Sequence, residues 1–186
     1  MMSGIDGGKI GPTIAELAVT AEATPHHFTL TDAMLNAPVP YDTNTKMNPP
    51  LREAADRDAM LEGIRDGSVD VIATDHAPHH ADEKNVEFDR APFGIVGLET
   101  AIPIAMQTLV HGGVISLSRL VELMSVNPAR IINVPGGSLT EGQPADITIL
   151  APDQSVTIDR TALVSKSKNT PYHGHTFRGV AAATIV

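Results

Sequence analysis

The sequence predicts an α/β fold, and three features of one stretch carry this prediction. Residues 53–66 place apolar side chains at helical spacing and charged side chains on the other faces. Gly67 stands where a glycine commonly ends a helix. Residues 69–74, VDVIAT, then read as a strand that is apolar on both faces, as in parallel sheets covered by helices. Helix, glycine, buried strand and the polar residues that follow it together make a unit of an α/β protein.

The other elements are predicted from similar local signals. Residues 17–23 read as a short buried strand, and residues 36–50, with four prolines, read as a long loop. Residues 81–93 read as a charged loop. Further helices are predicted at about 97–111 and 117–125, and a short one begins at Asn127-Pro128 with Asn as its N-cap.

The chain divides into three parts on composition. Residues 1–16 are Gly-rich and aperiodic and form an unassigned lead. Residues 17–134 carry the α/β pattern. From residue 135 to 186 the sequence is rich in Gly and Thr with short β-type runs, which predicts a small antiparallel β segment.

Composition limits the classes of function. The hydrophobic content of 42% supports a packed core, and an aromatic content of 3% predicts that this core is aliphatic. The net charge of −9 disfavours nucleic acid or an anionic membrane as the main partner. There are no cysteines, so disulfides, cysteine zinc ligands and a cysteine nucleophile are excluded. The sequence has no run of about 18 apolar residues and no secretory signal at its start, so we expect a cytoplasmic protein.

Asp75, His76, His79 and His80 follow directly after the predicted strand 69–74. Functional groups of α/β folds collect at the carboxyl ends of strands. One interpretation is a solvated turn, since Asp and Pro form turns. The other is metal chemistry, because Asp and His are suitable ligands for zinc. His76 and His79 are too close in sequence to assume that both face one metal.

Two further stretches carry candidate polar groups. His26 and His27 follow the predicted strand 17–23, and we interpret them as a loop pair that packs or hydrogen-bonds locally. Asn48, in KMNPPLR, has an amide that can pair with an imide or ureide edge.

Four stretches, taken in order, resemble one family. They are TAEATPHHFTLTD at 20–32, KMNPPLRE at 46–53, VIATDHAPHHADEK at 71–84 and APFGIVGLETAIP at 91–103. Together they resemble dihydroorotase, in its long bacterial type within the amidohydrolase superfamily. NPARIINVPGGSLTEGQPADITIL, at 127–150, looks like the continuation of the same family.

The resemblance implies a fold and a site. The fold is the C-terminal part of a (β/α)8 barrel, with strands seven and eight in residues 17–134, followed by a small β-sandwich-like segment at 135–186. The family interconverts dihydroorotate and N-carbamoyl-L-aspartate in pyrimidine biosynthesis at a metal site, usually zinc. Asp75 matches the last metal ligand and general base. The matching substrate contacts are Asn48, His79, Phe93 and Gly94, whereas His26 and His27 match no metal ligand.

The sequence departs from the family pattern in one respect. The HxH pair, the bridging carboxylate and the two single histidines that the family uses as ligands have no counterpart here. A catalytic zinc uses about three protein ligands plus water. We therefore expect a C-terminal portion, without the last strand of the family, that is inactive alone. We also expect open sheet edges and exposed apolar faces, which lead to self-association, binding of a complementary fragment or marginal stability.

Two alternatives remain open. The chain could be a noncatalytic scaffold that binds aspartate carbamoyltransferase, as some dihydroorotase-like proteins do. It could also be part of another cyclic amidohydrolase, a hydantoinase or allantoinase, although KMNPPLR, TDHAPH and APFGIVG look more like dihydroorotase.

Overall fold

A computed structural model describes residues 19–36 and 38–186. Strand β1 (Glu22–Ala23) pairs in parallel with β2 (Val71–Ile72), and the carboxylate of Asp70 accepts a hydrogen bond from the backbone of Ala21 beside this pair. Both predicted strands are therefore present, but each ladder is only two residues long. Residues 17 and 18 of the first prediction, and the whole lead 1–16, lie outside the described residues.

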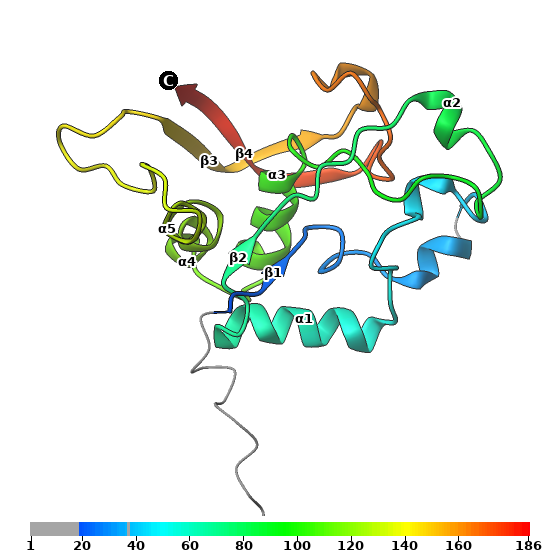
Figure 1. The fold of residues 1–186 in the computed structure, drawn as a ribbon, viewed down its shortest axis with the longest axis horizontal. Helices are drawn as coiled ribbons and strands as arrows, with labels where there is room; N and C mark the ends of the chain where they lie inside the picture. Colours follow the sequence, from blue (N-terminus) through cyan, green and yellow to red (C-terminus); the bar gives the residue numbers. More distant parts are fainter. Residues whose placement is uncertain (1–18, 37) are drawn as a thin grey trace, which may run out of the picture.

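Helix α1 (Ala54–Asp66) connects the two strands and runs below them in Figure 1. It confirms the prediction for residues 53–66. Ile64 is its buried residue, and Gly67 follows with a left-handed φ of 90°. The backbone of Val69 then donates to Gly63, so the chain leaves the helix and enters β2 at once.

A second helical region begins at Ala101. Helix α3 (Ala101–Ala105) continues into the π-helical η4 (Met106–His111). Helix α4 (Leu117–Val121), the π-helical η5 (Glu122–Val126) and α5 (Asn127–Ile131) form a second continuous run. The predicted N-cap at Asn127 is wrong, because this residue has helical dihedrals and its side chain donates instead to the carbonyl of Asp70, at 2.8 Å.

Short helical turns interrupt the predicted loops. The turn η2 (Asp32–Asn36) ends where the predicted loop 36–50 begins, η3 (Thr43–Thr45) lies within that loop, and the helical turn α2 (Ala81–Lys84) begins the predicted loop 81–93. Residues 81–93 are therefore not entirely loop. His80 caps α2 by accepting from the backbone of Asp82, and Glu83 accepts from the backbone of His80. Histidine is not among the usual N-caps, so residue type alone did not predict a helix start at this position.

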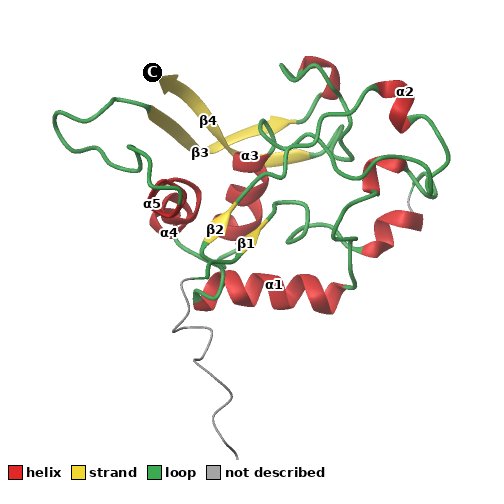
Figure 2. Cartoon of the chain, viewed as in Figure 1, coloured by secondary structure: helices red, strands yellow, loops and turns green. Residues whose placement is uncertain are grey.

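The C-terminal segment contains one antiparallel pair. Strand β3 (Ile147–Thr157) pairs with β4 (Thr176–Ile185), with two irregularities in register, and the turn η6 (Arg160–Ala162) lies between them. This pairing agrees with the predicted antiparallel β structure, and Figure 2 shows it as a second strand pair, separate from β1 and β2. The boundary at residue 135 stays a prediction.

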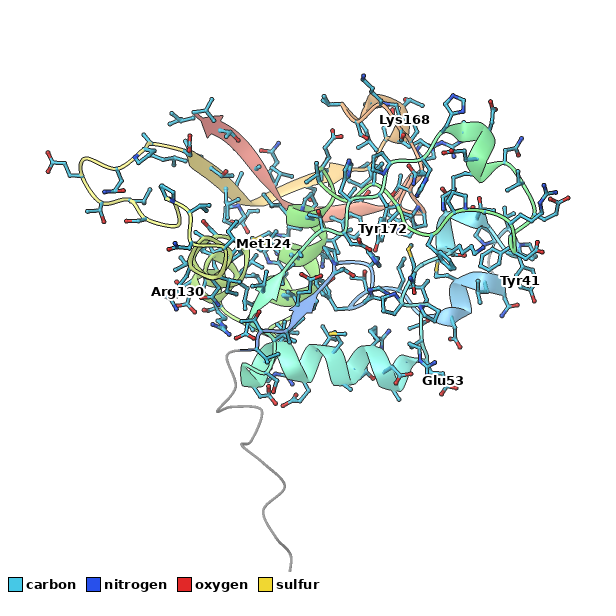
Figure 3. The ribbon with its side chains drawn as sticks, in the orientation of Figure 1. Tyr41, Glu53, Met124, Arg130, Lys168 and Tyr172 are labelled. Atoms are coloured by element: carbon cyan, nitrogen blue, oxygen red, sulfur yellow. The ribbon has the colours of Figure 1, made fainter. Side chains whose placement is uncertain are left out.

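The core is mostly aliphatic, as predicted, but not wholly so. Phe28, Tyr172 and Phe177 are all buried, and Tyr172 and Phe177 meet edge to face. Half of the six aromatic side chains thus lie inside, with Tyr172 near the centre of the molecule (Figure 3). No helix in the described part of the chain is long and apolar enough to cross a bilayer.

Candidate active site

Asp75 lies at the carboxyl end of β2 with an exposed side chain. Its φ of 47° is in the left-handed region, which Asp adopts more readily than most residues because its short polar side chain can bond locally. Among the described residues, its carboxylate takes part in no hydrogen bond or ion pair. Asp75 and Asn48 line the same cavity, of about 390 Å³. The structure therefore brings together two of the predicted site residues.

His27 orders the loop that carries Asn48. Its Nε2 lies 2.8 Å from the carbonyl oxygen of Pro49, and its Nδ1 lies 2.6 Å from the hydroxyl of Thr24. A carbonyl can only accept, so Nε2 carries the hydrogen and Nδ1 accepts from Thr24. His27 also lines the cavity of Asp75 and Asn48. The interpretation of His26 and His27 as a locally bonded pair agrees with this geometry.

His26, in contrast, is buried. Its side chain is 2% exposed, and its Nε2 has no hydrogen-bond partner among the described residues. Burial, and secondarily the neighbouring His27, lowers the pKa of His26 from 6.5 to about 3. The ring is therefore neutral at physiological pH and packs as part of the interior.

Among the predicted site residues, His79, Phe93 and Gly94 form a second group, apart from Asp75 and Asn48. The Nε2 of His79 donates to the carbonyl oxygen of Phe93 at 2.8 Å. Gly94 has a φ of 95°, and a Cβ at this position would lie 2.6 Å from the Cβ of Ala77, so only glycine fits without a shift. The phenyl ring of Phe93 is 52% exposed, and the ammonium of Lys46 lies 4.7 Å from its centroid.

Lys46 connects the two groups. Its carbonyl accepts from the backbone of Gly94 at 2.8 Å, and it lies two residues before Asn48. Its ammonium also donates to the carbonyls of Asp89 and Ala91. However, His79 lines a different cavity, of about 650 Å³, from that of Asp75 and Asn48. That all the predicted residues contact one substrate stays a proposal.

His76 and His79 point at different partners. The Nδ1 of His76 accepts from the backbone of Gly97 at 3.0 Å, whereas the ring of His79 contacts Phe93. The residue 76 backbone also forms a parallel bridge with Ile95. His76 thus anchors the turn after β2 to the segment that precedes α3.

The described residues do not by themselves fit a metal ion. In residues 19–36 and 38–186, no three or more His, Asp, Glu or Cys side chains come together as a possible ligand set. Asp75 is a single carboxylate, and a catalytic zinc needs about three protein ligands.

Three residues that matter to this geometry gave no sequence signal. Lys84 is 7% exposed and donates to the carbonyls of Thr43 and Pro92, and Asn169 contacts both loops of the second group. Lys46 lies in the motif KMNPPLR, but nothing in this motif predicts the contacts of its side chain. Their contacts span many positions in the chain, so no periodicity or short motif reports them.

Parallel strands connected by a helix, with the exposed Asp75 beyond the carboxyl end of β2, define an α/β protein. The chain belongs to the amidohydrolase family, whose model matches residues 12–186. The α/β class predicted from the sequence is confirmed.

The curated relatives are dihydroorotases. The chain is 53% identical over 168 residues to the dihydroorotase of Pelotomaculum thermopropionicum and 52% identical over 168 residues to that of Trichlorobacter lovleyi. Each match covers 90% of this chain and 39% of the relative, so the chain spans about two fifths of the length of these relatives. The resemblance to a portion of dihydroorotase is confirmed.

Solved structures of related hydrolases have the same fold. The L-hydantoinase (dihydropyrimidinase) of Arthrobacter aurescens superposes with a TM-score of 0.83 at 28% identity, over 90% of this chain and 38% of that one. The dihydropyrimidinase of Brevibacillus agri superposes with a TM-score of 0.81 at 23% identity, over 89% of this chain and 37% of that one. The second likeness shows the fold alone.

Proposed function

We propose that this chain carries the C-terminal part of a dihydroorotase-type cyclic amidohydrolase, which interconverts dihydroorotate and N-carbamoyl-L-aspartate in pyrimidine biosynthesis. The observation that carries the proposal is the position of Asp75, which leaves β2 with a free carboxylate in the cavity that Asn48 also lines. The identity of 53% to a dihydroorotase, against 28% to a hydantoinase, favours dihydroorotate over a hydantoin as the substrate.

Each candidate residue then has a chemical role. Asp75 accepts the proton of the water that attacks the ring carbonyl, and it returns this proton to the leaving amide nitrogen. Asn48 offers an amide donor and acceptor to the ureide edge of the substrate. His79, Phe93 and Gly94 contact the substrate and orient it for the attack.

The chain alone is proposed to be inactive. Family resemblance implies zinc, and the described residues supply one of its ligands, Asp75, so the others must come from outside these residues. We propose that the active form also contains the part of the barrel that this chain does not cover. Several exposed apolar side chains are available for such contacts: Leu98, Val121, Ile131, Ile132, Val134 and Leu139.

The test is a chimera. The matching portion of the Pelotomaculum thermopropionicum dihydroorotase is replaced by this chain, and the opening of dihydroorotate is compared with that of hydantoin. We expect hydrolysis of dihydroorotate, and loss of about 10²–10⁴-fold in kcat for Asp75→Asn, which removes the base. Asn tolerates the left-handed backbone as Asp does, so the fold is retained.

Asp66→Asn is the matched control, because this exposed carboxylate at the end of α1 lies outside the cavity. It should leave kcat unchanged. Preference for hydantoin, or equal activity of the Asp75→Asn and parent chimeras, would contradict the proposal. Turnover of dihydroorotate by the isolated chain would contradict the proposed dependence on the rest of the barrel.

A further inference from the structure

We propose that Asn169 is a positioning residue, whose buried amide fixes the turn after β2 against the Phe93–Gly94 segment. Asn169 comes from the loop before β4, far from both segments in the sequence. The inference rests on the proposed function, because it assigns Asn169 to the substrate-contacting part of the same site.

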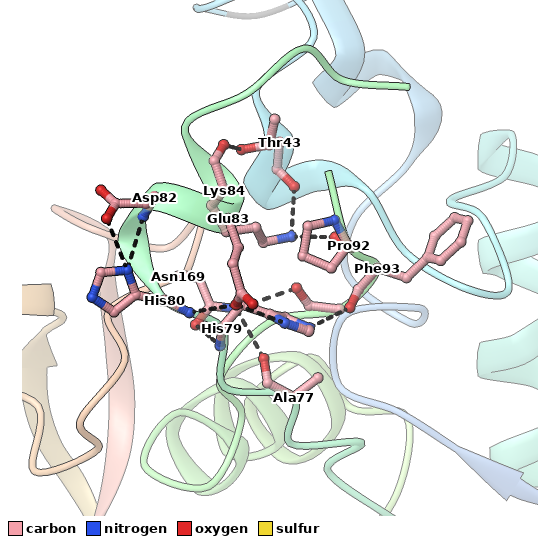
Figure 4. A network of polar contacts seen from close by, with 11 residues as sticks. Thr43, Ala77, His79, His80, Asp82, Glu83, Lys84, Pro92, Phe93 and Asn169 are labelled. Carbon is pink, nitrogen blue, oxygen red and sulfur yellow. Dashed lines mark hydrogen bonds and ion pairs between the residues drawn. The ribbon is translucent and has the colours of Figure 1, made fainter. Parts of the chain in front are cut away.

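The amide of Asn169 contacts both segments at once. Its Nδ2 donates to the carbonyl of Ala77 at 2.9 Å and to the carbonyl of Gly94 at 3.3 Å, and its Oδ1 accepts from the backbone of His79 at 3.3 Å (Figure 4). Its own carbonyl accepts from the backbone of Val96 at 3.0 Å. The residue is 6% exposed, so water does not substitute for these partners.

The hydrogen-bonding capacity of this position suits an amide. Two donors and one acceptor are used on a side chain with one methylene group. An aspartate has the same shape but, when ionised, no donor, so it would direct negative charge at two carbonyl oxygens. An apolar side chain would leave the part-buried N–H of His79 and the carbonyls of Ala77 and Gly94 without this partner.

Loss of this amide would disturb the candidate substrate contacts specifically. His79 donates to Phe93 through its ring, and the backbone of Ala77 donates to Ile95 at 2.8 Å, so the two segments are bonded on either side of Asn169. Gly94 and Ala77 are also in close contact. Asn169 adds three hydrogen bonds to these contacts, and we expect its loss to loosen the placement of His79 against Gly94, whereas Asp75 makes no contact with it.

The first experiment uses the chimera described above, with Asn169→Asp compared with Tyr172→Phe. The control lies in the same loop, is also buried and loses the hydrogen bond from the Tyr172 hydroxyl to Thr29, and neither of these residues lines the cavity of Asp75 or that of His79. For Asn169→Asp we expect KM for dihydroorotate to rise by ~10-fold or more with kcat reduced by less than ~3-fold, since ground-state contacts and not the base are affected. For Tyr172→Phe we expect both constants within ~2-fold of the parent. Equal KM values for the two variants would overturn the proposal.

The second experiment needs no activity and separates this inference from the proposed function. Amide hydrogen exchange is measured on the full chain alone, and the amides of His79 and Val96 should exchange at least ~10-fold faster in Asn169→Leu, which removes the acceptor of the His79 N–H, than in Tyr172→Phe. Unchanged exchange at both amides would overturn the positioning role even if the parent chimera hydrolyses dihydroorotate. Faster exchange together with an inactive parent chimera would support the positioning of the loops and count against the proposed function. If Asn169→Asp or Asn169→Leu does not fold, Asn169→Ser, which keeps one donor but is too short to reach all three partners, replaces it in that measurement, with the same direction of change expected.

Discussion

The imidazole Nε2 of His79 lies 2.8 Å from the carbonyl oxygen of Phe93, and this contact joins the turn after β2 to a segment 14 residues further on. Gly94 follows directly, and its backbone N–H donates to Lys46, two residues before Asn48. Three separate stretches are thus bonded to one another around the candidate site.

Gly94→Ala should be more destabilising than a glycine substitution at a similar backbone angle. At φ 95° the new methyl would lie 2.6 Å from the Cβ of Ala77, so we expect a loss of about 2–3 kcal/mol in the free energy of unfolding, from the steric clash and the backbone strain together. Urea denaturation measures this loss.

Gly174→Ala is the control for the backbone alone. Gly174 has φ 82° with no atom within 4 Å of the added Cβ, so its substitution should cost only about 1 kcal/mol. Adding Ala77→Gly to Gly94→Ala should recover the part of the stability loss that exceeds the loss in Gly174→Ala. Equal losses of stability for Gly94→Ala and Gly174→Ala would show that the contact with Ala77 does not contribute to the loss.

His26 should make the protein sensitive to acid. Its pKa is about 3 in the folded chain and 6.5 in the unfolded chain, so between these values only the unfolded chain takes up the proton. The stabilisation is fully present above pH 6.5 and is lost as the pH falls towards 3. Between pH 6.5 and 4 we expect a loss of about 3 kcal/mol from this group.

The test is the difference in unfolding free energy between the parent chain and His26→Phe, measured at both pH values. The substitution removes the titrating group and its unbonded nitrogen but keeps a ring of similar size. The parent should lose more stability on acidification than the variant. Parallel pH profiles would mean that His26 accepts a proton in the folded chain as easily as in the unfolded one.

Lys84 should change the free energy of unfolding at alkaline pH. Burial lowers its pKa from 10.5 to about 8, so from pH 8 to 10.5 the unfolded chain holds a proton that the folded chain has released. Stability contributed by this group therefore rises with pH over this window, by up to about 3 kcal/mol.

Chemical denaturation of the parent, Lys84→Met and Lys166→Met from pH 7.5 to 10.5 checks this rise. Lys84→Met should abolish it, while Lys166→Met should retain it because Lys166 is exposed. A rise that persists in Lys84→Met would assign the effect to other groups.

Local patterns predicted the part of the fold that local interactions determine. Helix α1, the left-handed Gly67 and the position of Asp75 after a strand follow from periodicity and turn chemistry within a few residues. Four short motifs pointed to the family, and the relatives confirm that resemblance. The packing of Phe28, Tyr172 and Phe177 in a core with few aromatics could not be read from composition, because burial depends on tertiary contacts.

The sequence could not report contacts between distant residues. Asn169 lies 90 residues from His79, and its role depends on the loop before β4 returning to the end of β2. Asn127 carries a strong N-cap signal, yet the helical run that begins at α4 continues through it, because its side chain has a partner in Asp70. The N-cap prediction at Asn127 is wrong, and the contacts of Asn169 could not be predicted, for the same reason. Each depends on a tertiary hydrogen bond that no local pattern reports.

Zinc affinity, measured by competition with a chelator on the chimera and on the isolated chain, tests whether Asp75 is one ligand of a site completed elsewhere. We expect the isolated chain to retain no stoichiometric zinc, the chimera to bind it, and Asp75→Asn to weaken this binding by at least about tenfold, since even residues that only orient a ligand cost about 10–100-fold when removed. Stoichiometric zinc on the isolated chain, or unchanged affinity in the Asp75→Asn chimera, would show that Asp75 is not such a ligand.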